Sequence, residues 1–272
     1  MSPYLGALRL TELTPEVIAR WQSERLTAAA GRTAVRHALE LLASMLQRAV
    51  ESQRLPVNPA RLVKKAARPR RSEIRPLPPI TVERMRAAAK PRDAALLSVL
   101  AYAGLRPGEA LALQWGDVRD RTLLVERAAS LGEEQDTKTG AHRSVRLLAP
   151  LAADLREWRL ATGRPPDRAL VFPRPDGGVW TKTDWDNWRR RTFARALVAA
   201  GVEHARPYDL RHSFASLLLH EGRSVIHVAR QLGHDARLTL GAYGHVIDEL
   251  EGEPRIDAER AIATARDRAR AA

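Results

Sequence analysis

Apolar residues recur at helical spacing through the N-terminal part of the chain. In residues 34–50, "AVRHALELLASMLQRAV", they follow one face of a helix, at positions 35, 38, 39, 42, 45, 46 and 49. Before this segment, Thr14 and Pro15 supply a helix N-cap and a first-turn proline, and predict another helix through Ile18 and Trp21. Residues 1–63 are therefore expected to form a small all-helical unit.

The helical pattern stops at residues 64–80, "KKAARPRRSEIRPLPPI", a segment rich in basic residues and proline. Proline disfavours helix and like charges repel one another, so the segment predicts an extended, exposed linker between two domains. A solvated linker and a contact with nucleic-acid phosphates are about equally compatible with it. The candidate DNA-binding residues are Lys64, Lys65, Arg68, Arg70 and Arg71, together with Arg143 farther along the chain.

The remainder, residues 81–272, predicts mostly helix with a small β interruption. Between residues 121 and 149, "RTLLVE" and "HRSVRLLA" indicate strands, with a turn close to "TKTG". The C-terminal "RIDAERAIATARDRARAA" predicts a helix with a weak apolar face, which could pack on its own domain or on a neighbour. The expected fold is mainly α with a small antiparallel β-sheet. Helices are expected near 81–89, 92–103, 107–113, 150–161, 183–200, 208–221 and 224–232.

The net charge of the chain limits the classes of molecule that it is expected to bind. A formal net charge of +13 favours a polyanion, either a nucleic acid or an acidic membrane surface. The basic residues are spread along the chain rather than gathered on one amphipathic helix, which disfavours the membrane. No run of about 18 apolar residues and no signal peptide is present, so a cytoplasmic protein that binds DNA or RNA is expected.

Composition also limits the chemistry. The chain has no cysteine, which excludes disulfides, thiolate zinc sites and cysteine nucleophiles. Its eight histidines form no His-Glu-x-x-His pair, so no metal or other cofactor is expected. Only five of the 45 basic residues are lysines, a bias typical of a GC-rich genome, bacterial or phage-derived.

Two arginines stand at predicted helix starts. In "AGLRPGEALALQWGDV", Pro107 suits the first helical position and places Arg106 near the N-cap, where free backbone N–H groups attract anions. In "PYDLRHSFASLLLH", Arg211 lies in the first turn of a helix whose apolar face is buried. A buried arginine needs a partner, and no acid lies three or four residues away. The partner could be another part of the fold or a ligand phosphate, whereas Arg106 could also be an ordinary surface arginine.

Three further residues are candidates with simpler alternatives. Lys138, near a hairpin tip, could be merely solvated or could reach over a bound polymer and donate a proton. His234 follows a Leu-Gly turn after a helix, and Tyr243 lies on the next helix. Tyr243 could be a core aromatic or a nucleophile.

Together these residues fit one reaction. Two arginines can bind the non-bridging oxygens of a phosphodiester through paired hydrogen bonds and stabilise the five-coordinate phosphorus. A tyrosine can attack that phosphorus and store the bond energy as a phosphotyrosine, so no ATP is needed to rejoin the strand. Lys138 could protonate the leaving hydroxyl, and His234 could hydrogen-bond the phosphate.

The chain resembles the tyrosine recombinase (phage integrase) family over nearly its full length. The matching stretches are "GLRPGEALALQWGDV", "TKTGAHRSVRL", "YDLRHSFAS" and "LGHDARLTLGAYGHV", in the family's order and spacing. The resemblance implies that Arg106 and Arg211 bind phosphate, that Lys138 is the general acid, that His234 assists, and that Tyr243 is the nucleophile. It also implies a two-domain DNA clamp, a helical core-binding domain (1–63) and a catalytic domain (81–272), a 3′-phosphotyrosine intermediate, and a homotetramer on two double-stranded DNA sites.

The chain departs from the family at two places. The family usually has histidine three residues before the second arginine, where this chain has Tyr208. Tyrosine can still hydrogen-bond a phosphate or the nucleophile, but with an ordinary pKa near 10 it is a poor base. The segment "LGALRLTELTPEVIARW" resembles the middle of the family's core-binding domain, so its first helix and any arm-binding domain are expected to be missing.

Three functions follow from these observations. The leading hypothesis is a site-specific recombinase of a mobile element, which could be monomeric when free and could be assisted by DNA-bending or directionality proteins. A second is a non-catalytic DNA-binding remnant of an integrase, which predicts salt-sensitive binding without a covalent adduct. A third is strand relaxation of the topoisomerase IB type, which predicts plasmid relaxation without a preferred site.

Overall fold

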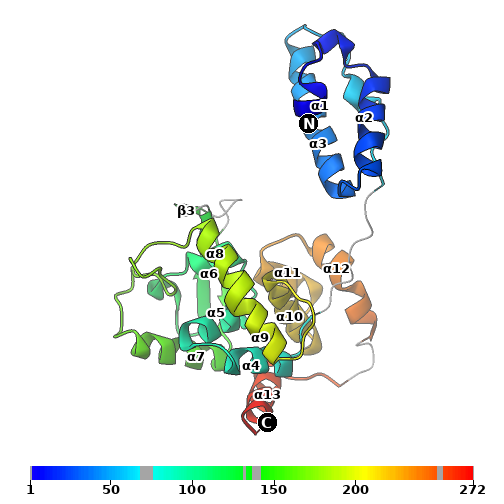
Figure 1. Ribbon diagram of the computed structural model, residues 1–272. Coiled ribbons are helices and arrows are strands. Elements are labelled where there is room, and N and C mark those ends of the chain that lie inside the picture. The colour runs from blue at the N-terminus through cyan, green and yellow to red at the C-terminus, as the bar shows by residue number, and fades with distance from the viewer. Residues whose placement is uncertain (1, 68–75, 131–132, 137–141, 250–253, 272) are drawn as a thin grey trace. The chain divides into compact units, whose positions relative to one another are not determined.

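The chain folds into two compact units, residues 1–73 and 74–272 (Figure 1). The computed structural model describes residues 2–67, 76–130, 133–136, 142–249 and 254–271. Among the helices in these ranges, none has the length and apolar character needed to cross a membrane.

The first unit is all-helical, as predicted. Its two long helices are α2 (Pro15–Thr27) and α3 (Arg32–Glu51), and the Thr14 side chain caps α2 by accepting a hydrogen bond from the Val17 amide. Ile18 and Leu39 are fully buried between them. The short elements are α1 (Ser2–Leu5) and the 3₁₀ turns Leu10–Glu12 and Pro59–Arg61.

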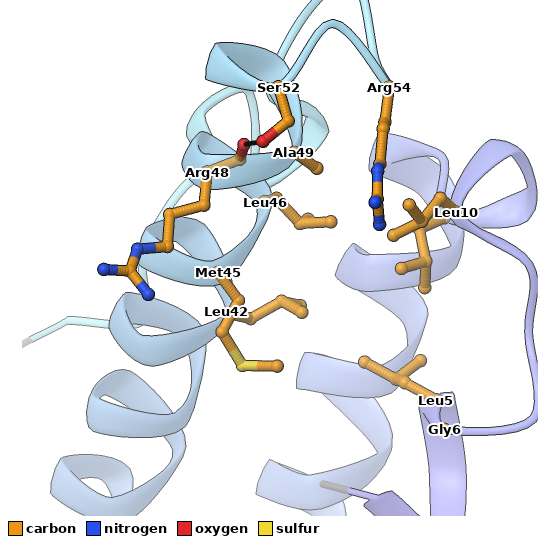
Figure 2. A pocket seen from close by; sticks show the side chains of 11 residues that line it. Leu5, Gly6, Leu10, Leu42, Met45, Leu46, Arg48, Ala49, Ser52 and Arg54 are labelled. Atoms are coloured by element: carbon orange, nitrogen blue, oxygen red, sulfur yellow. Dashed lines mark hydrogen bonds between the residues drawn. The ribbon is translucent and has the colours of Figure 1, made fainter.

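A groove opens on the apolar side of α3 in this unit. Leu5, Leu42 and Leu46 face a common space in Figure 2, which has a volume of about 490 Å³. Met45 and Leu10, on its border, are exposed. Part of the apolar interior of the first unit is therefore open to solvent.

The second unit is built around α5 (Pro91–Tyr102), which is buried along most of its length. It packs against α4 (Pro79–Ala87), α7 (Ala149–Ala161) and α10 (Pro207–His220). Proline in the first turn suits each of these helices, because the amide it lacks would have no partner there. The other helices are α6 (Pro107–Leu111), α8 (Lys182–Trp188), a π-helical turn (Arg189–Phe193), α9 (Ala194–Ala199), α11 (Val225–Leu232), α12 (Ala236–Glu249) and α13 (Ala258–Ala271), with a 3₁₀ turn at Trp115–Asp117.

The predicted helices of this unit are confirmed, with one interruption. The helix expected over residues 183–200 contains the π-helical turn between α8 and α9. The C-terminal helix α13 packs on α4 of its own chain and buries Ala258, Ile262 and Ala265 (Figure 1). Arg266 anchors it, with Nη2 2.6 Å from Asp154 Oδ2.

Within the described residues, the β-strands form two separate antiparallel pairs. The predicted strands are confirmed as β1 (Thr122–Val125) and β4 (Arg143–Arg146), in a register that pairs Leu123 with Val145. A second pair, β2 (Arg127–Ser130) and β3 (Glu133–Asp136), was not predicted. Its segments, "RAAS" and "EEQD", are poor in the β-branched and aromatic residues that mark strands.

The end of the predicted linker is different in the structure. Pro79 and Ile80 form the first turn of α4 instead of an extended segment, because proline is well suited to a helix start. The Leu77 amide donates to Ser213 Oγ at 2.9 Å, which ties this end to α10. The basic residues Arg68, Arg70 and Arg71 lie outside the described residues.

Candidate active site

Arg211 is a buried cation in the first turns of α10. It is 2% exposed, and its guanidinium donates to the carbonyl oxygens of Gly104, at 2.5 Å, and of Leu232. Among the described side chains, no carboxylate forms an ion pair with it. Burial and the nearby charge of Arg106 lower the pKa of Arg211 to about 10, so the group stays charged at neutral pH. The partners that the sequence required for Arg211 are therefore backbone carbonyls. Because they carry no net charge, the positive charge of Arg211 remains to attract an anion.

The Gly104 carbonyl is held in place by a turn that needs glycine. Gly104 has φ +60°, and a Cβ there would lie 2.5 Å from Cδ1 of Phe214. Only glycine combines that conformation with such close packing. The turn precedes α6 and leads directly to Arg106.

Arg106 is the N-cap of α6, as predicted, and its side chain is 41% exposed. Its Nη1 lies 2.7 Å from Glu109 Oε1, and its backbone amide donates to the other carboxylate oxygen at 2.8 Å. Its Nη2 donates to the Gly233 carbonyl at 3.1 Å. The guanidinium is thus oriented on two sides while part of it stays open to a ligand.

Glu109 is the shared anchor of two arginines. Besides Arg106, it receives Arg143 through Nη1 at 2.9 Å and Nη2 at 2.6 Å. Although burial opposes ionisation, the hydrogen bonds and charge of Arg143, together with the hydrogen bonds of Arg106, hold the pKa of Glu109 below its ordinary value. Arg143, predicted from the sequence as a DNA contact, is mostly buried and its Nε donates to the Gln231 carbonyl. Its guanidinium binds Glu109 and the Gln231 carbonyl inside the protein. A direct contact of Arg143 with DNA stays a prediction.

The Leu232-Gly233-His234 turn joins the two arginines. The Leu232 carbonyl accepts from Arg211 and the Gly233 carbonyl from Arg106, residues far apart in sequence. His234 follows directly, with Nδ1 3.2 Å from the Asp235 carbonyl and 3.3 Å from the Thr239 hydroxyl. Burial lowers the pKa of His234; the Asp235 carbonyl opposes this shift, and the charges of Arg211 and Arg106 add to it. The structure therefore brings three of the predicted residues, Arg106, Arg211 and His234, to one turn.

Tyr243 lies on α12, the next helix, and is only 1% exposed. Its hydroxyl forms a hydrogen bond with Nδ1 of His212 on α10. Burial raises the pKa of the Tyr243 hydroxyl, the positive charge of Arg211 opposes the shift, and Tyr208 adds to it. The ring of Tyr208 is 43% exposed and lies edge-on to His212, with ring centroids 5.3 Å apart. Tyr208 thus contacts the partner of Tyr243.

Two site residues were missed from the sequence. His212 follows Arg211 directly and lies four residues after Tyr208, a spacing that places 208 and 212 on one helix face. Glu109 occupies the third position of the helix that begins at Pro107, where an acid can bond back to the N-cap residue. Both signals were present in the sequence. Lys138 lies outside the described residues, and within the described part of the chain no group of His, Asp and Glu could hold a metal ion.

The arrangement can bind an anion and transfer a group to it. Two guanidiniums oriented by carbonyls and a carboxylate form a preorganised positive site. A phenol and an imidazole lie beside it, joined by a hydrogen bond. Tyrosine and histidine are respectively capable of nucleophilic and acid–base catalysis.

Comparison with known proteins identifies the family of this chain. Residues 77–249 match the model of the phage integrase family. The integrase of Mycobacterium phage L5 is 27% identical over 244 residues, which cover 85% of this chain and 63% of the phage protein. Tyrosine recombinase XerC of Xanthomonas axonopodis pv. citri (strain 306) is 32% identical over 155 residues, 57% of this chain and 47% of that protein. The chain thus spans less than two thirds of the length of either relative.

The fold is also similar to that of a solved integrase. A lambda integrase (75-356) dimer bound to a COC′ core site matches with a TM-score of 0.69 and 16% sequence identity. The match covers 93% of this chain and 85% of that one. At this identity the similarity shows the fold alone. Since the family model covers more than half of the sequence, the chain belongs to the phage integrase family, the tyrosine recombinases.

Proposed function

We propose that this protein is a site-specific recombinase that cleaves and rejoins double-stranded DNA through Tyr243. The observation that carries the proposal is the Leu232–His234 turn, whose carbonyls orient Arg106 and Arg211 and which leads directly into the helix that bears Tyr243. A phosphate held by both arginines would lie next to the start of α12. Binding and nucleophilic groups would then meet at one phosphodiester.

The arginines supply the electrostatic part of the reaction. A phosphodiester gains negative charge on its non-bridging oxygens as the phosphorus becomes five-coordinate, and preorganised donors stabilise that charge. Arg211 is buried and donates to two backbone carbonyls, whereas Arg106 is partly exposed and can fold onto an incoming phosphate. We assign His234 a hydrogen bond to the same phosphate. Removing one such donor typically lowers the rate about a hundredfold to a thousandfold.

Tyr243 supplies the covalent step. Its oxygen attacks phosphorus, the bond to the 5′ oxygen breaks, and the products are a 3′-phosphotyrosine and a 5′-hydroxyl. Lys138 donates the proton that the departing oxygen takes up, and Tyr208 supports the site from its partly exposed position. The phosphotyrosine keeps the energy of the broken bond, so the reverse attack rejoins a strand without ATP. Because Tyr243 is buried in the free protein, we expect DNA binding to shift α12.

We assign the first unit (unit 1, residues 1–73), which includes most of the basic linker, to DNA binding rather than to the chemical step. Lys64 and Lys65 lie at the end of this unit, where Lys65 Nζ is 3.2 Å from Glu40 Oε1 in an exposed pair that contributes little to stability. Lys65 can exchange that partner for phosphate, and the positive charges of Lys64, Arg68, Arg70 and Arg71 suit the same role. We assign unit 1 to the core-binding half of a two-domain clamp. A homotetramer on two DNA sites, with accessory DNA-bending proteins, completes the proposal.

The test is covalent capture on DNA. The full chain is incubated with nicked duplexes that carry sequence flanking its own gene, and adducts are resolved on denaturing gels. An adduct formed by the wild type and by Tyr4→Phe, and lost in Tyr243→Phe, supports the proposal; Tyr4 is an exposed tyrosine of unit 1 and serves as the matched control. Loss in Tyr208→Phe as well would give Tyr208 a supporting role.

Two outcomes would replace the proposal. Salt-sensitive binding without any adduct would identify a DNA-binding remnant. Relaxation of plasmids with no preferred site would identify a topoisomerase-like activity.

A further inference from the structure

The partner of the Tyr243 hydroxyl is a histidine that the sequence motifs did not single out. His212 is half-buried on α10, one residue after Arg211, and its Nδ1 bonds the hydroxyl across the contact between α10 and α12. The two ring centroids are 5.6 Å apart. Among the described side chains, His212 is the one that hydrogen-bonds this hydroxyl.

The surroundings of His212 favour its neutral form. Asp209, Arg211 and Tyr208 face it from α10, Arg206 from the start of that helix, His234 from the turn after α11, and Tyr243 from α12. Burial lowers the pKa of His212; Asp209 opposes the shift, and Arg211, Arg206 and His234 add to it. A neutral imidazole with its proton on Nε2 leaves the lone pair of Nδ1 free to accept a proton.

Tyr243 in turn needs a base. A phenol with an ordinary pKa near 10 is almost wholly protonated at neutral pH, and burial raises the pKa of Tyr243 further. The Arg211 charge offsets only part of that shift. A proton acceptor in direct contact with the hydroxyl removes this obstacle at the moment of attack.

We propose that His212 is a catalytic base and acid: it accepts the Tyr243 proton during cleavage and returns it during rejoining. The proposal rests on the proposed function. In cleavage, the Tyr243 oxygen bonds to phosphorus, the bond from phosphorus to the 5′ oxygen breaks, and the phenolic proton moves to Nδ1 of His212. The 5′ oxygen takes its proton from the general acid. In rejoining, the 5′ oxygen bonds to phosphorus and its proton returns to the group that served as general acid, while the bond from phosphorus to the Tyr243 oxygen breaks and His212 gives its proton back to that oxygen.

Tyr208 is the alternative candidate by position in the sequence, three residues before Arg211. Its ring is partly exposed and contacts His212 edge-on, whereas the Tyr243 hydroxyl is hydrogen-bonded by His212 itself. Tyr208 therefore acts as a positioning residue for His212. Its replacement by phenylalanine keeps the ring and removes the hydroxyl, so it distinguishes the loss of a positioning contact, which lowers the rate without changing the pH profile, from the loss of the base.

The first experiment uses the wild-type protein. Single-turnover cleavage is measured from pH 5 to 9 on a duplex in which sulfur replaces the bridging 5′ oxygen, because a thiolate leaves without needing a proton. We expect the rate to fall as the pH drops through the range where His212 becomes protonated, and to level off above it. A rate that rises tenfold per pH unit over the whole range would overturn the proposal, since it would show that the phenol loses its proton to solvent.

The second experiment compares His212→Asn and His212→Gln with Tyr208→Phe. Both amides can hydrogen-bond a hydroxyl but cannot take its proton at these pH values. We expect a loss of about a hundredfold to ten-thousandfold on both the ordinary and the sulfur-bridged duplex, and a rate that now rises tenfold per pH unit. Tyr208→Phe should keep the shape of the wild-type profile.

Two results on the variants would overturn the proposal: a wild-type pH profile, or full rescue by the sulfur-bridged duplex. DNA binding of each variant, measured alongside, shows that it folds. A wild type that forms no adduct through Tyr243 would instead refute the proposed function. The two failures are therefore distinguishable.

Discussion

Removing the charge of Glu109 should destabilise unit 2 far more than an ordinary surface substitution. The Glu109 side chain is 3% exposed, and its carboxylate accepts four hydrogen bonds, two from Arg106 and two from Arg143. Arg143 is 11% exposed, and in Glu109→Leu it would keep the Gln231 carbonyl as its remaining acceptor among the described residues. An uncompensated buried charge of this kind costs about 3–5 kcal/mol.

The two arginines do not contribute equally to that cost. The Arg106 side chain is 41% exposed, so in the variant water solvates its charge in place of the carboxylate. Its ion pair with Glu109 therefore accounts for about 0–1 kcal/mol of the lost unfolding free energy. Most of the loss therefore comes from Arg143. Removing that charge as well, in Glu109→Leu with Arg143→Met, should recover about 2–3 kcal/mol, because a buried pair replaced by apolar groups is close to neutral.

Urea unfolding followed by tryptophan fluorescence measures these losses. Five of the six tryptophans lie in unit 2, at positions 115, 158, 180, 185 and 188, and the sixth, Trp21, lies in unit 1. A Trp21→Phe background confines the signal to unit 2 and allows its transition to be analysed by itself. The free energies of the two single variants and the double variant then give the coupling energy.

Two results would refute this reasoning. One is a loss below about 1 kcal/mol in Glu109→Leu, which would mean that water already compensates Arg143. The other is a double variant whose loss equals the sum of the single losses, which would mean that the two side chains are not coupled.

Three further predictions concern Gly233 in the Leu232–His234 turn, the stability of the protein at acid pH, and the stability of the first unit. Gly233→Ala should cost at least about 1–2 kcal/mol and weaken DNA cleavage, because Gly233 has φ +67° and a Cβ would lie 2.8 Å from Cδ of Arg143; thermal unfolding and adduct yield check this. Burial lowers the pKa of His212 and of His234 in the fold, so the unfolded chain binds more protons and stability should fall as the pH drops below about 6.5; melting temperatures from pH 5 to 8 should show a slope that His212→Asn reduces. Leu39→Ala should destabilise unit 1 by about 2–5 kcal/mol and leave the unfolding of unit 2 unchanged, as read from Trp21 and from the other tryptophans separately.

The local elements of this fold could be predicted because their signals are local. Helices that begin with proline and carry apolar residues at helical spacing were found at nearly their observed bounds, as α5 and α10 show. The pair β2 and β3 was not found, because its residues have little intrinsic strand preference and their pairing with each other decides the conformation. The interruption at Arg189–Phe193 likewise has no signal in a helical pattern that continues through it.

The sequence by itself determined the family to which this protein belongs. Four stretches in the family's order, among them those that contain Arg106, Arg211, His234 and Tyr243, were enough to identify the family, since such motifs are local in sequence. The tertiary structure decided which groups face one another. It turned Arg143 inward to Glu109, gave Arg211 carbonyl partners, and placed His212 on the Tyr243 hydroxyl. These contacts join helices that are distant in sequence, and their physical basis is the burial of polar groups, which must find partners wherever the packed core puts them.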